Sequence, residues 1–145
     1  MEQALEQRIH KALERRERDR QTGAEVESPE LRELRLAHDR VVAEIPGALE
    51  RLSGAIDEMN DTVSESGVHF SLSTVDELHT IEASFHVAIW PFEDRELVFN
   101  VSHDGKLIVL LGTRQSRVRM NARDIRHADR AFFLDALVSL LEAAV

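Results

Sequence analysis

The stretch VHFSLSTVDELHTIEASFHVAIW, residues 68–90, alternates apolar and polar side chains in two runs. In the first run the apolar residues are Val68, Phe70 and Leu72, and in the second run every odd-numbered residue is apolar. An apolar period of two is typical of strands that bury one face of a sheet. We therefore expect two adjacent strands here, joined by a turn over residues 76–79.

Further strands are expected after residue 90. Residues 97–102 alternate in the same way, and Asp104-Gly105 supplies a hairpin turn because glycine accepts a positive φ. Residues 106–113, KLIVLLGT, are apolar on both faces, which is typical of a strand covered on both sides. A fifth strand is expected over residues 116–120. Because the links between successive strands are short, the sequence predicts a five-stranded antiparallel meander.

The chain before Gly67 has a helical period instead. Ser28-Pro29-Glu30 combines an N-cap serine, a proline at the first helical position and an acid in the first turn. From there a stripe of apolar residues and one histidine recurs at spacings of three and four: Leu31, Leu34, His38, Val41, Ile45, Leu49, Leu52, Ile56, Met59 and Val63. The stripe keeps its phase across Pro46-Gly47 and predicts one long kinked helix over about 29–65. A helical hairpin that turns at Pro46 is the alternative.

A helix over 29–65 would be about 55 Å long at 1.5 Å per residue, which exceeds the diameter expected of a globule of this size. The apolar residues at its far end must therefore be buried by something other than the rest of the domain, and a second copy of the chain is the simplest candidate. Apolar residues of this helix and of the Trp90-Pro91-Phe92 segment are the expected interface of such a homodimer: Leu34, Val41, Ile45, Leu52, Trp90 and Phe92. For Trp90 and Phe92, packing in the core under the loop is the favoured alternative.

Helices are also expected at both ends of the chain. Asp129 is a candidate N-cap for a C-terminal helix whose apolar face packs on the sheet. A narrow apolar stripe predicts a helix over 3–20, within an extension, residues 1–27, that is flexible or ordered by a partner. Together these elements predict a single α+β domain over 1–145.

Composition excludes several classes of protein. The 145 residues include 18 Lys and Arg against 27 Asp and Glu, which gives a formal charge of −9. A general polyanion binder needs surplus positive charge to release counterions, so nucleic acid is a disfavoured partner. The chain has no cysteine, which excludes disulfides, catalytic thiols and metal sites built on cysteine.

Segments and motifs that would place the protein in a membrane or in a known enzyme class are absent. No apolar run is long enough for a signal peptide or a membrane span, so we expect a cytoplasmic protein without a membrane partner. The sequence has no glycine-rich phosphate loop, HExxH, EF-hand loop or GxSxG. A non-enzymatic protein without a cofactor or metal is therefore favoured.

Polar residues on one face of the expected strand pair are candidates for ligand binding. Pairing Val75 with Thr80 would set His69 opposite His86, with their Cβ atoms about 4.5–5.5 Å apart. Two imidazoles and a carboxylate so placed bind a metal or move a proton; an ordinary solvent-facing strand pair is the favoured alternative, and a polar partner-binding surface is another. The candidate ligand residues are His69, Glu82, His86 and Asn100.

Arginines gather in residues 114–130, where six basic and two acidic residues give +6 − 2 = +4. Such a cluster binds an anionic ligand or a phosphate backbone, or it forms salt bridges with the acid-rich helices of the same or a neighbouring subunit. Salt bridging is favoured, because no aromatic residues are interleaved for stacking on bases. The candidate anion-binding residues are Arg117, Arg119, Arg123, Arg126 and Arg130, with Arg114 beside them.

These observations favour a protein-interaction or chaperone-like adaptor module that forms a homodimer and holds a protein client. The alternatives are a small-molecule or metal-binding protein that uses His69, Glu82 and His86, and an anion or nucleic-acid binder that uses the cluster from Arg114 to Arg130. In size, acidity and its final apolar-faced helix the chain resembles small dimeric secretion chaperones, which implies a chaperone-like role. Those chaperones interrupt their strands with a helix that this sequence lacks.

Overall fold

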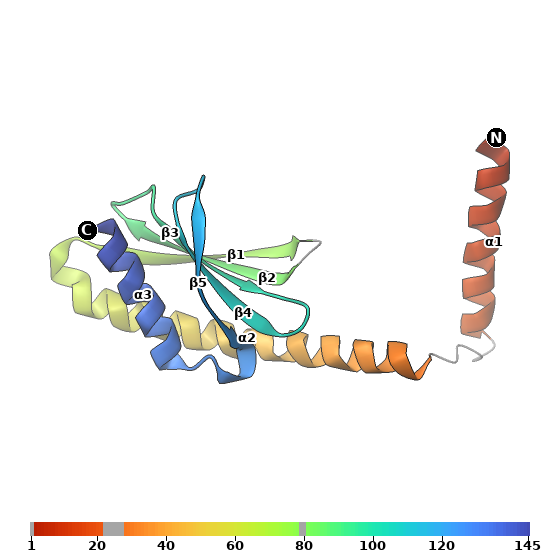
Figure 1. The fold of residues 1–145 in the computed structure, drawn as a ribbon, viewed down its shortest axis with the longest axis horizontal. Helices are drawn as coiled ribbons and strands as arrows, with labels where there is room; N and C mark the ends of the chain where they lie inside the picture. The colour runs from red at the N-terminus through yellow and green to blue at the C-terminus, as the bar shows by residue number, and fades with distance from the viewer. Residues whose placement is uncertain (1, 22–27, 79–80) are drawn as a thin grey trace. The chain divides into compact units, whose positions relative to one another are not determined.

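The computed structural model describes residues 2–21, 28–78 and 81–145 and orders them as helices, then strands, then a final helix (Figure 1). The elements are α1 (Glu2–Gln21), α2 (Pro29–Val63), the 3₁₀ turn η1 (Ser64–Ser66), β1 (His69–Leu78), β2 (Ile81–Trp90), β3 (Glu96–Val101), β4 (Lys106–Gly112), β5 (Arg117–Asp124), the 3₁₀ turn η2 (Ile125–His127) and α3 (Arg130–Ala144). This order confirms the predicted α+β class. The chain divides into two compact units, Met1–Arg35 and Leu36–Val145.

Helix α2 begins where the sequence predicts and continues through Pro46. The Leu31 N–H donates to the Ser28 side-chain oxygen at 3.2 Å, which confirms the serine cap. The alternative of a hairpin at Pro46 is wrong, because α2 is one helix of 35 residues. An internal proline costs about 3 kcal/mol, and the full burial of Ala48 and Leu52 just after it offsets that cost.

The strands form one antiparallel sheet in the order β1-β2-β3-β4-β5, as predicted. The predicted pairing of β1 with β2 is wrong, because Val75 pairs with Ser84 and His69 with Trp90. Strand β1 continues through Leu78, so the predicted turn over 76–79 is also too early; residues 79 and 80 lie outside the described residues. The true register differs from the predicted one by four residues, and an even shift keeps every side chain on its face. Alternation therefore could not distinguish the two registers.

Helices α2 and α3 pack on the same face of the sheet and bury its apolar side chains. Phe99 of β3 and Phe133 of α3 meet edge to face, with ring centroids 5.4 Å apart. Asp129 caps α3 as predicted, since its carboxylate accepts from the Phe132 N–H at 2.9 Å. The largest fully buried side chains include Leu52, Phe70, Phe85, Ile89, Leu97, Phe99, Leu107, Phe133, Leu137 and Leu140.

The opposite face of the sheet, here called the open face, carries no helix of the Leu36–Val145 unit (Figure 1). The expectation that β4 is covered on both sides is met only in part, because Leu107 and Val109 are buried on the helix side while Ile108 and Leu110 are half-buried. No helix in the described ranges is long and apolar enough to cross a membrane.

The turn between β3 and β4 touches α2, and glycine makes that contact possible. Gly105 has a φ of 83°, as the hairpin signal predicts. A Cβ built on it would lie 3.1 Å from a methyl carbon of Val41. Its backbone oxygen also accepts from the Ile125 N–H at 2.8 Å, which ties this turn to the end of β5.

Candidate functional site

A connected set of polar side chains lies on the open face and links three strands. Ser84 of β2 pairs directly with Asn100 of β3, and His86 lies two residues further along β2 on the same face. Glu96 begins β3 and Arg117 begins β5. We refer to these five residues as the open-face network.

The contacts of the open-face network form one chain, from Asn100 through Ser84, His86 and Glu96 to Arg117. The Ser84 hydroxyl donates to Asn100 Oδ1 at 2.8 Å, and its oxygen lies 2.9 Å from His86 Nε2. His86 Nδ1 lies 2.5 Å from Glu96 Oε1. Arg117 Nη2 then donates to Glu96 Oε2 at 2.8 Å. Each side chain is thus held by a neighbour on another strand or on the same face.

Gly112 makes the last of these contacts possible. Strand pairing sets Glu96 opposite Gly112 and Gly112 opposite Arg117, so the three residues form one row across β3, β4 and β5. Cross-strand side chains in such a row are immediate neighbours. Because Gly112 has no side chain, Arg117 reaches over β4 to the carboxylate of Glu96.

Burial and charge fix the ionisation of Glu96. Its side chain is largely buried between His86 and Arg117. Burial alone raises the pKa of Glu96, but the hydrogen bonds from His86 and Arg117 and the charge of Arg117 outweigh burial and hold the pKa below its ordinary value. The carboxylate is therefore the anionic centre of the network.

The order serine, histidine, carboxylate is that of a nucleophilic triad, but the burial of the serine argues against that chemistry. Ser84 is only 1% exposed, and its single proton is directed at Asn100. A nucleophile must reach its substrate, whereas this hydroxyl is enclosed by neighbouring side chains. The arrangement is suited to holding β2, β3 and β5 in register.

The structure brings together only part of the predicted ligand face. His86 and Asn100 meet through Ser84, whereas His69 lies opposite Trp90 and does not face His86. The predicted His69–His86 pair is thus wrong, for the register reason given above. In the described parts of the chain, no group of three or more His, Asp or Glu side chains is arranged so that it could hold a metal ion.

Glu82 belongs to a second polar cluster, separate from the open-face network. Its carboxylate lies 2.5 Å from His103 Nδ1 and 3.4 Å from His38 Nε2. His38 is on α2 and His103 is in the turn between β3 and β4. Glu82 therefore joins the sheet to α2 and to that turn.

Sequence reasoning missed Ser84 and Glu96 as partners of His86, and it missed Arg117 as the partner of Glu96. Ser84 and His86 are two residues apart in β2, so the period of two predicts that they lie on the same face of the sheet. Glu96 and Arg117 are 21 residues apart, and only the strand order with Gly112 between them brings them together. No local pattern signals that contact.

Most of the predicted anion-binding arginines are paired with carboxylates of their own chain. Arg117 pairs with Glu96, Arg126 with Asp124, Arg130 with Glu58, and Arg123 lies 3.9 Å from Asp129 and over the Phe132 ring. Within the described residues, Arg119 and Arg114 form no such pair. These two guanidinium groups are the ones left for an external anion.

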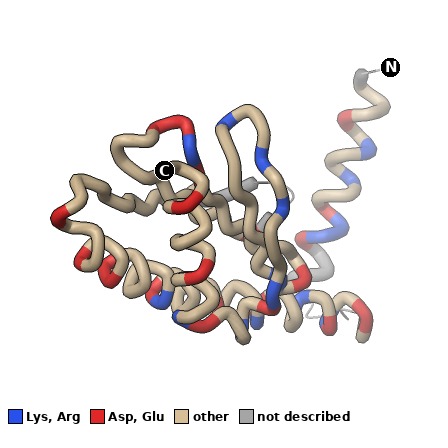
Figure 2. The backbone as a smooth tube through the Cα atoms, turned by 60° about the vertical axis from the view of Figure 1, so that its left-hand side comes forward, with Lys and Arg blue, Asp and Glu red and all other residues tan. Residues whose placement is uncertain are grey.

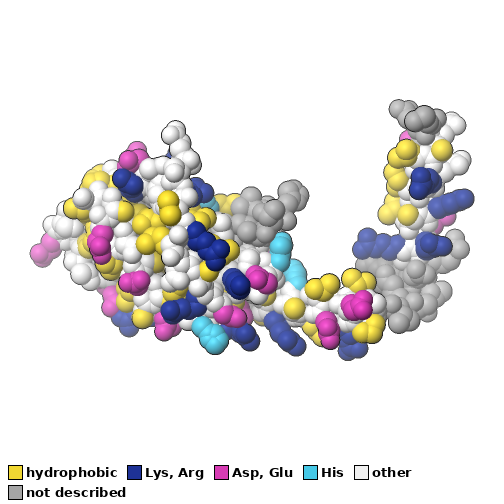
Figure 3. Space-filling model, viewed as in Figure 1, with side chains coloured by type: hydrophobic (Ala, Val, Ile, Leu, Met, Phe, Trp, Pro, Cys, Tyr) yellow, Lys and Arg dark blue, Asp and Glu magenta, His cyan; other side chains and the backbone are white. Residues whose placement is uncertain are grey.

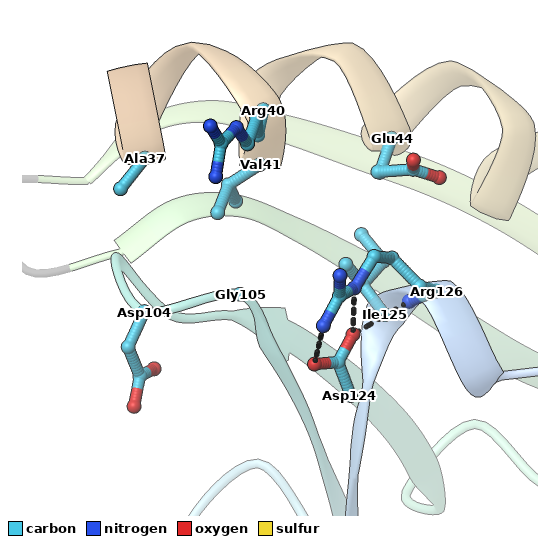
Figure 4. A pocket seen from close by; sticks show the side chains of 9 residues that line it. All are labelled: Ala37, Arg40, Val41, Glu44, Asp104, Gly105, Asp124, Ile125 and Arg126. Carbon is cyan, nitrogen blue, oxygen red and sulfur yellow. Dashed lines mark hydrogen bonds and ion pairs between the residues drawn. The ribbon is translucent and has the colours of Figure 1, made fainter. Parts of the chain in front are cut away.

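A cavity of about 350 Å³ lies between α2 and the ends of β4 and β5 (Figure 4). Its charged lining residues are Arg40, Glu44, Asp104, Asp124 and Arg126, two basic against three acidic. Asp124 holds Arg126 through two side-chain contacts of 3.1 Å, and the hydrogen bonds from Arg126 lower the pKa of Asp124 to about 2. With one of its arginines neutralised, the cavity does not favour an anion.

The predicted interface residues separate into core and surface. Val41 and Leu52 are buried in the core of their own chain, and Ile45 and Phe92 pack against that core. Leu34 is 67% exposed and Trp90 is 60% exposed. Only these last two present a substantial apolar surface to solvent.

Replacing Glu96 by glutamine is expected to lower stability at neutral pH by about 1.5–3 kcal/mol, since hydrogen bonds to charged groups are worth about that much. Because the folded pKa of Glu96 lies below its unfolded value, its contribution is full above the unfolded pKa and is lost as the pH falls through the folded pKa. The difference between wild type and Glu96→Gln should therefore shrink in acid. Urea unfolding from pH 7 to pH 3 measures it, with Glu93→Gln, an exposed residue of the β2–β3 connection, as control. A difference that grows in acid would contradict the assignment.

Comparisons with known proteins give no match to a family model, to a curated protein or to a solved structure. Function must therefore be argued from the residues of this chain. Two features remain for that argument. They are the exposed apolar residues of the helices and two arginines of the β4–β5 hairpin, Arg114 and Arg119, which have no carboxylate partner among the described residues.

Proposed function

We propose that this protein is a non-enzymatic interaction module that works as a homodimer, joined through apolar residues of α1 and of the first turns of α2. The observation that carries the proposal is the change in burial along α2. Its buried residues all lie between Val41 and Met59, whereas residues 29–40 are exposed throughout. Leu31 and Leu34 extend the same stripe into that exposed part.

Helix α1 carries a second unpartnered stripe. Leu5, Ile9 and Leu13 recur every four residues and are each more than half exposed. Figure 3 shows hydrophobic side chains on the surface of α1. Exposed leucines and isoleucines at helical spacing are the residues that pack between helices in coiled coils and bundles. Burying one such side chain contributes about 1.5–3 kcal/mol of favourable free energy. If the stripes of two chains are buried together, the summed free energy is large enough to offset the entropy that is lost on association.

The charges of these helices permit a second copy as the partner. Residues 29–40 contain three basic and three acidic residues, so two such surfaces do not repel each other through net charge. A symmetric homodimer also requires no further chain, and a two-fold interface is the commonest arrangement among oligomers.

Replacing Leu34 by glutamate is expected to weaken the dimer. A dimer loses two buried leucines at about 1.5 kcal/mol each, and about 3 kcal/mol corresponds to roughly a 100-fold rise in the dissociation constant. Sedimentation velocity of the full chain over a range of concentrations measures this constant. Because Leu34 is exposed in the single chain, the variant should keep the wild-type circular dichroism spectrum.

Arg32→Glu is the matched control. It also adds negative charge to an exposed position of the same turns of α2, but it lies on the opposite side of the helix from Leu34 because residues two apart face away from each other. The control should dimerise like wild type. Equal weakening by both variants would show that charge and not the apolar stripe is responsible, and an unaffected Leu34→Glu dimer would contradict the proposed interface.

A further inference from the structure

We propose that the outer edge of β5 binds an extended, acidic segment of a partner protein, which adds to the sheet as another strand. Strand β5 is the last in the sheet order, so one side of it pairs with β4 and, among the residues that the structure describes, the other side pairs with no strand. Edge strands present unsatisfied main-chain groups and are templates for strand addition. This surface is distinct from the helical stripes of the proposed dimer, and the inference does not depend on them.

In the first part of β5, before Met120, the main-chain groups that do not face β4 belong to two arginines. Thr113 N–H donates to the Ser116 carbonyl at 2.9 Å, which closes the β4–β5 hairpin. Inward and outward main-chain groups alternate along an antiparallel strand. Arg117 and Arg119 therefore direct their N–H and C=O groups to the outer edge.

A β-bulge limits the open edge to this first part of β5. The register between β4 and β5 shifts between Val109 and Leu110, so that Met120 has no direct partner. Just beyond it, the Ala122 N–H is already satisfied by the Asn121 side chain at 2.9 Å. An added strand would thus pair alongside Arg117 and Arg119 and end at the bulge.

An apolar groove beside this edge can receive side chains of the added strand. It has a volume of about 490 Å³ and runs between the β4–β5 hairpin and the end of α3, where Leu111, Val118, Met120 and Ala143 line it. Val118 is 66% exposed. Figure 3 shows apolar side chains gathered beside basic ones on this part of the unit. The groove favours a segment with apolar residues at alternate positions.

Charge selects an acidic occupant and disfavours a second copy of β5. Basic residues follow the β4–β5 hairpin along its length (Figure 2), and among the described residues Arg114 and Arg119 lack a carboxylate partner. Pairing β5 with itself would bring arginines of like charge together, which is unfavourable. An extended segment with alternating acidic and apolar residues satisfies the open main chain, the groove and the free guanidinium groups together.

The test uses the full chain and a labelled, N-acetylated eight-residue peptide of alternating glutamate and valine. We expect saturable binding by fluorescence anisotropy that weakens as salt is added, together with slower amide hydrogen exchange at Arg117 and Arg119. The double variant Arg114→Glu with Arg119→Glu should weaken binding at least tenfold, and Arg32→Glu should not. Both replaced side chains are exposed, so the fold should be retained.

Further probes separate strand addition from general anion binding without altering the protein. A lysine–valine peptide should not bind, and the glutamate–valine peptide N-methylated at alternate residues, which cannot donate those hydrogen bonds, should lose binding. The proposal is overturned if the parent peptide does not bind at millimolar concentration, or if the N-methylated peptide binds equally well. It is also overturned if a single-stranded oligonucleotide of eight thymidines binds equally well, because charge alone would then explain recognition.

Discussion

Replacing Phe133 by alanine should lower the free energy of unfolding by about 3–5 kcal/mol, the range for deleting a buried phenylalanine. Phe133 is fully buried and meets Phe99 and Phe132 edge to face at 5.4 and 5.6 Å. Alanine would remove both ring contacts and leave a cavity where α3 meets the sheet. Urea unfolding followed by circular dichroism measures the change, at a fixed protein concentration because a dimer gains stability with concentration.

Val138→Ala is the matched control for this prediction. Val138 lies on the same helix but is 39% exposed, so its truncation should cost less than about 1 kcal/mol. A loss below 1 kcal/mol for Phe133→Ala, or equal losses for the two variants, would show that α3 is not packed on the sheet as described.

Replacing Gly112 by alanine should destabilise the protein by about 3 kcal/mol or more, because no relaxation of a side chain can accommodate the new methyl group. A Cβ at this position would lie 2.1 Å from the Ser116 carbonyl oxygen and 3.0 Å from the Arg117 Cα. Both are main-chain atoms, so the β4–β5 hairpin itself must move. We expect the unfolding midpoint to fall and the amides of β5 to lose protection from hydrogen exchange before those of β2.

Gly54→Ala provides the opposite result from the same chemical change. Gly54 is exposed within α2, and a Cβ there would meet nothing within 4 Å. Alanine is the better helix former, so this variant should gain about 0.5–1 kcal/mol. If Gly112→Ala were as stable as wild type, the close approach of the hairpin to Gly112 would be wrong.

The order of elements was predictable because each has a local signature. The change of period after Gly67, the Ser28-Pro29 start and the Asp129 cap depend on residues close together in sequence, and the structure confirms all three. Passage of α2 through Pro46 was predictable from the unbroken phase of the stripe, although the packing that offsets the proline is visible only in the fold.

The open-face network was only partly predictable, because it depends on register and strand order. His86 and Asn100 were recognised as candidates, but their link through Ser84 required the true pairing of β2 with β3. The contact between Glu96 and Arg117 required the knowledge that Gly112 lies between them. The apolar period of two determines on which face of the sheet a side chain lies. It does not determine which residues of the neighbouring strands lie beside that side chain.

The arginine cluster shows how net charge and available charge differ. Residues 114–130 carry a net charge of +4, which by itself suggests an anion site. Two carboxylates from outside this segment neutralise arginines within it: Glu58 of α2 pairs with Arg130, and Glu96 of β3 pairs with Arg117. The guanidinium groups that remain for an external partner lie in the β4–β5 hairpin and at the edge of β5.

The most direct test of the proposed homodimer is the mass of the native full-length protein at micromolar concentration. Native mass spectrometry should give a particle of twice the chain mass of 16.5 kDa, and Leu34→Glu should shift it to the single-chain mass under the same conditions. A wild-type protein that has the single-chain mass at every concentration up to about 100 μM, which corresponds to an association free energy weaker than about −5.5 kcal/mol, would contradict the account.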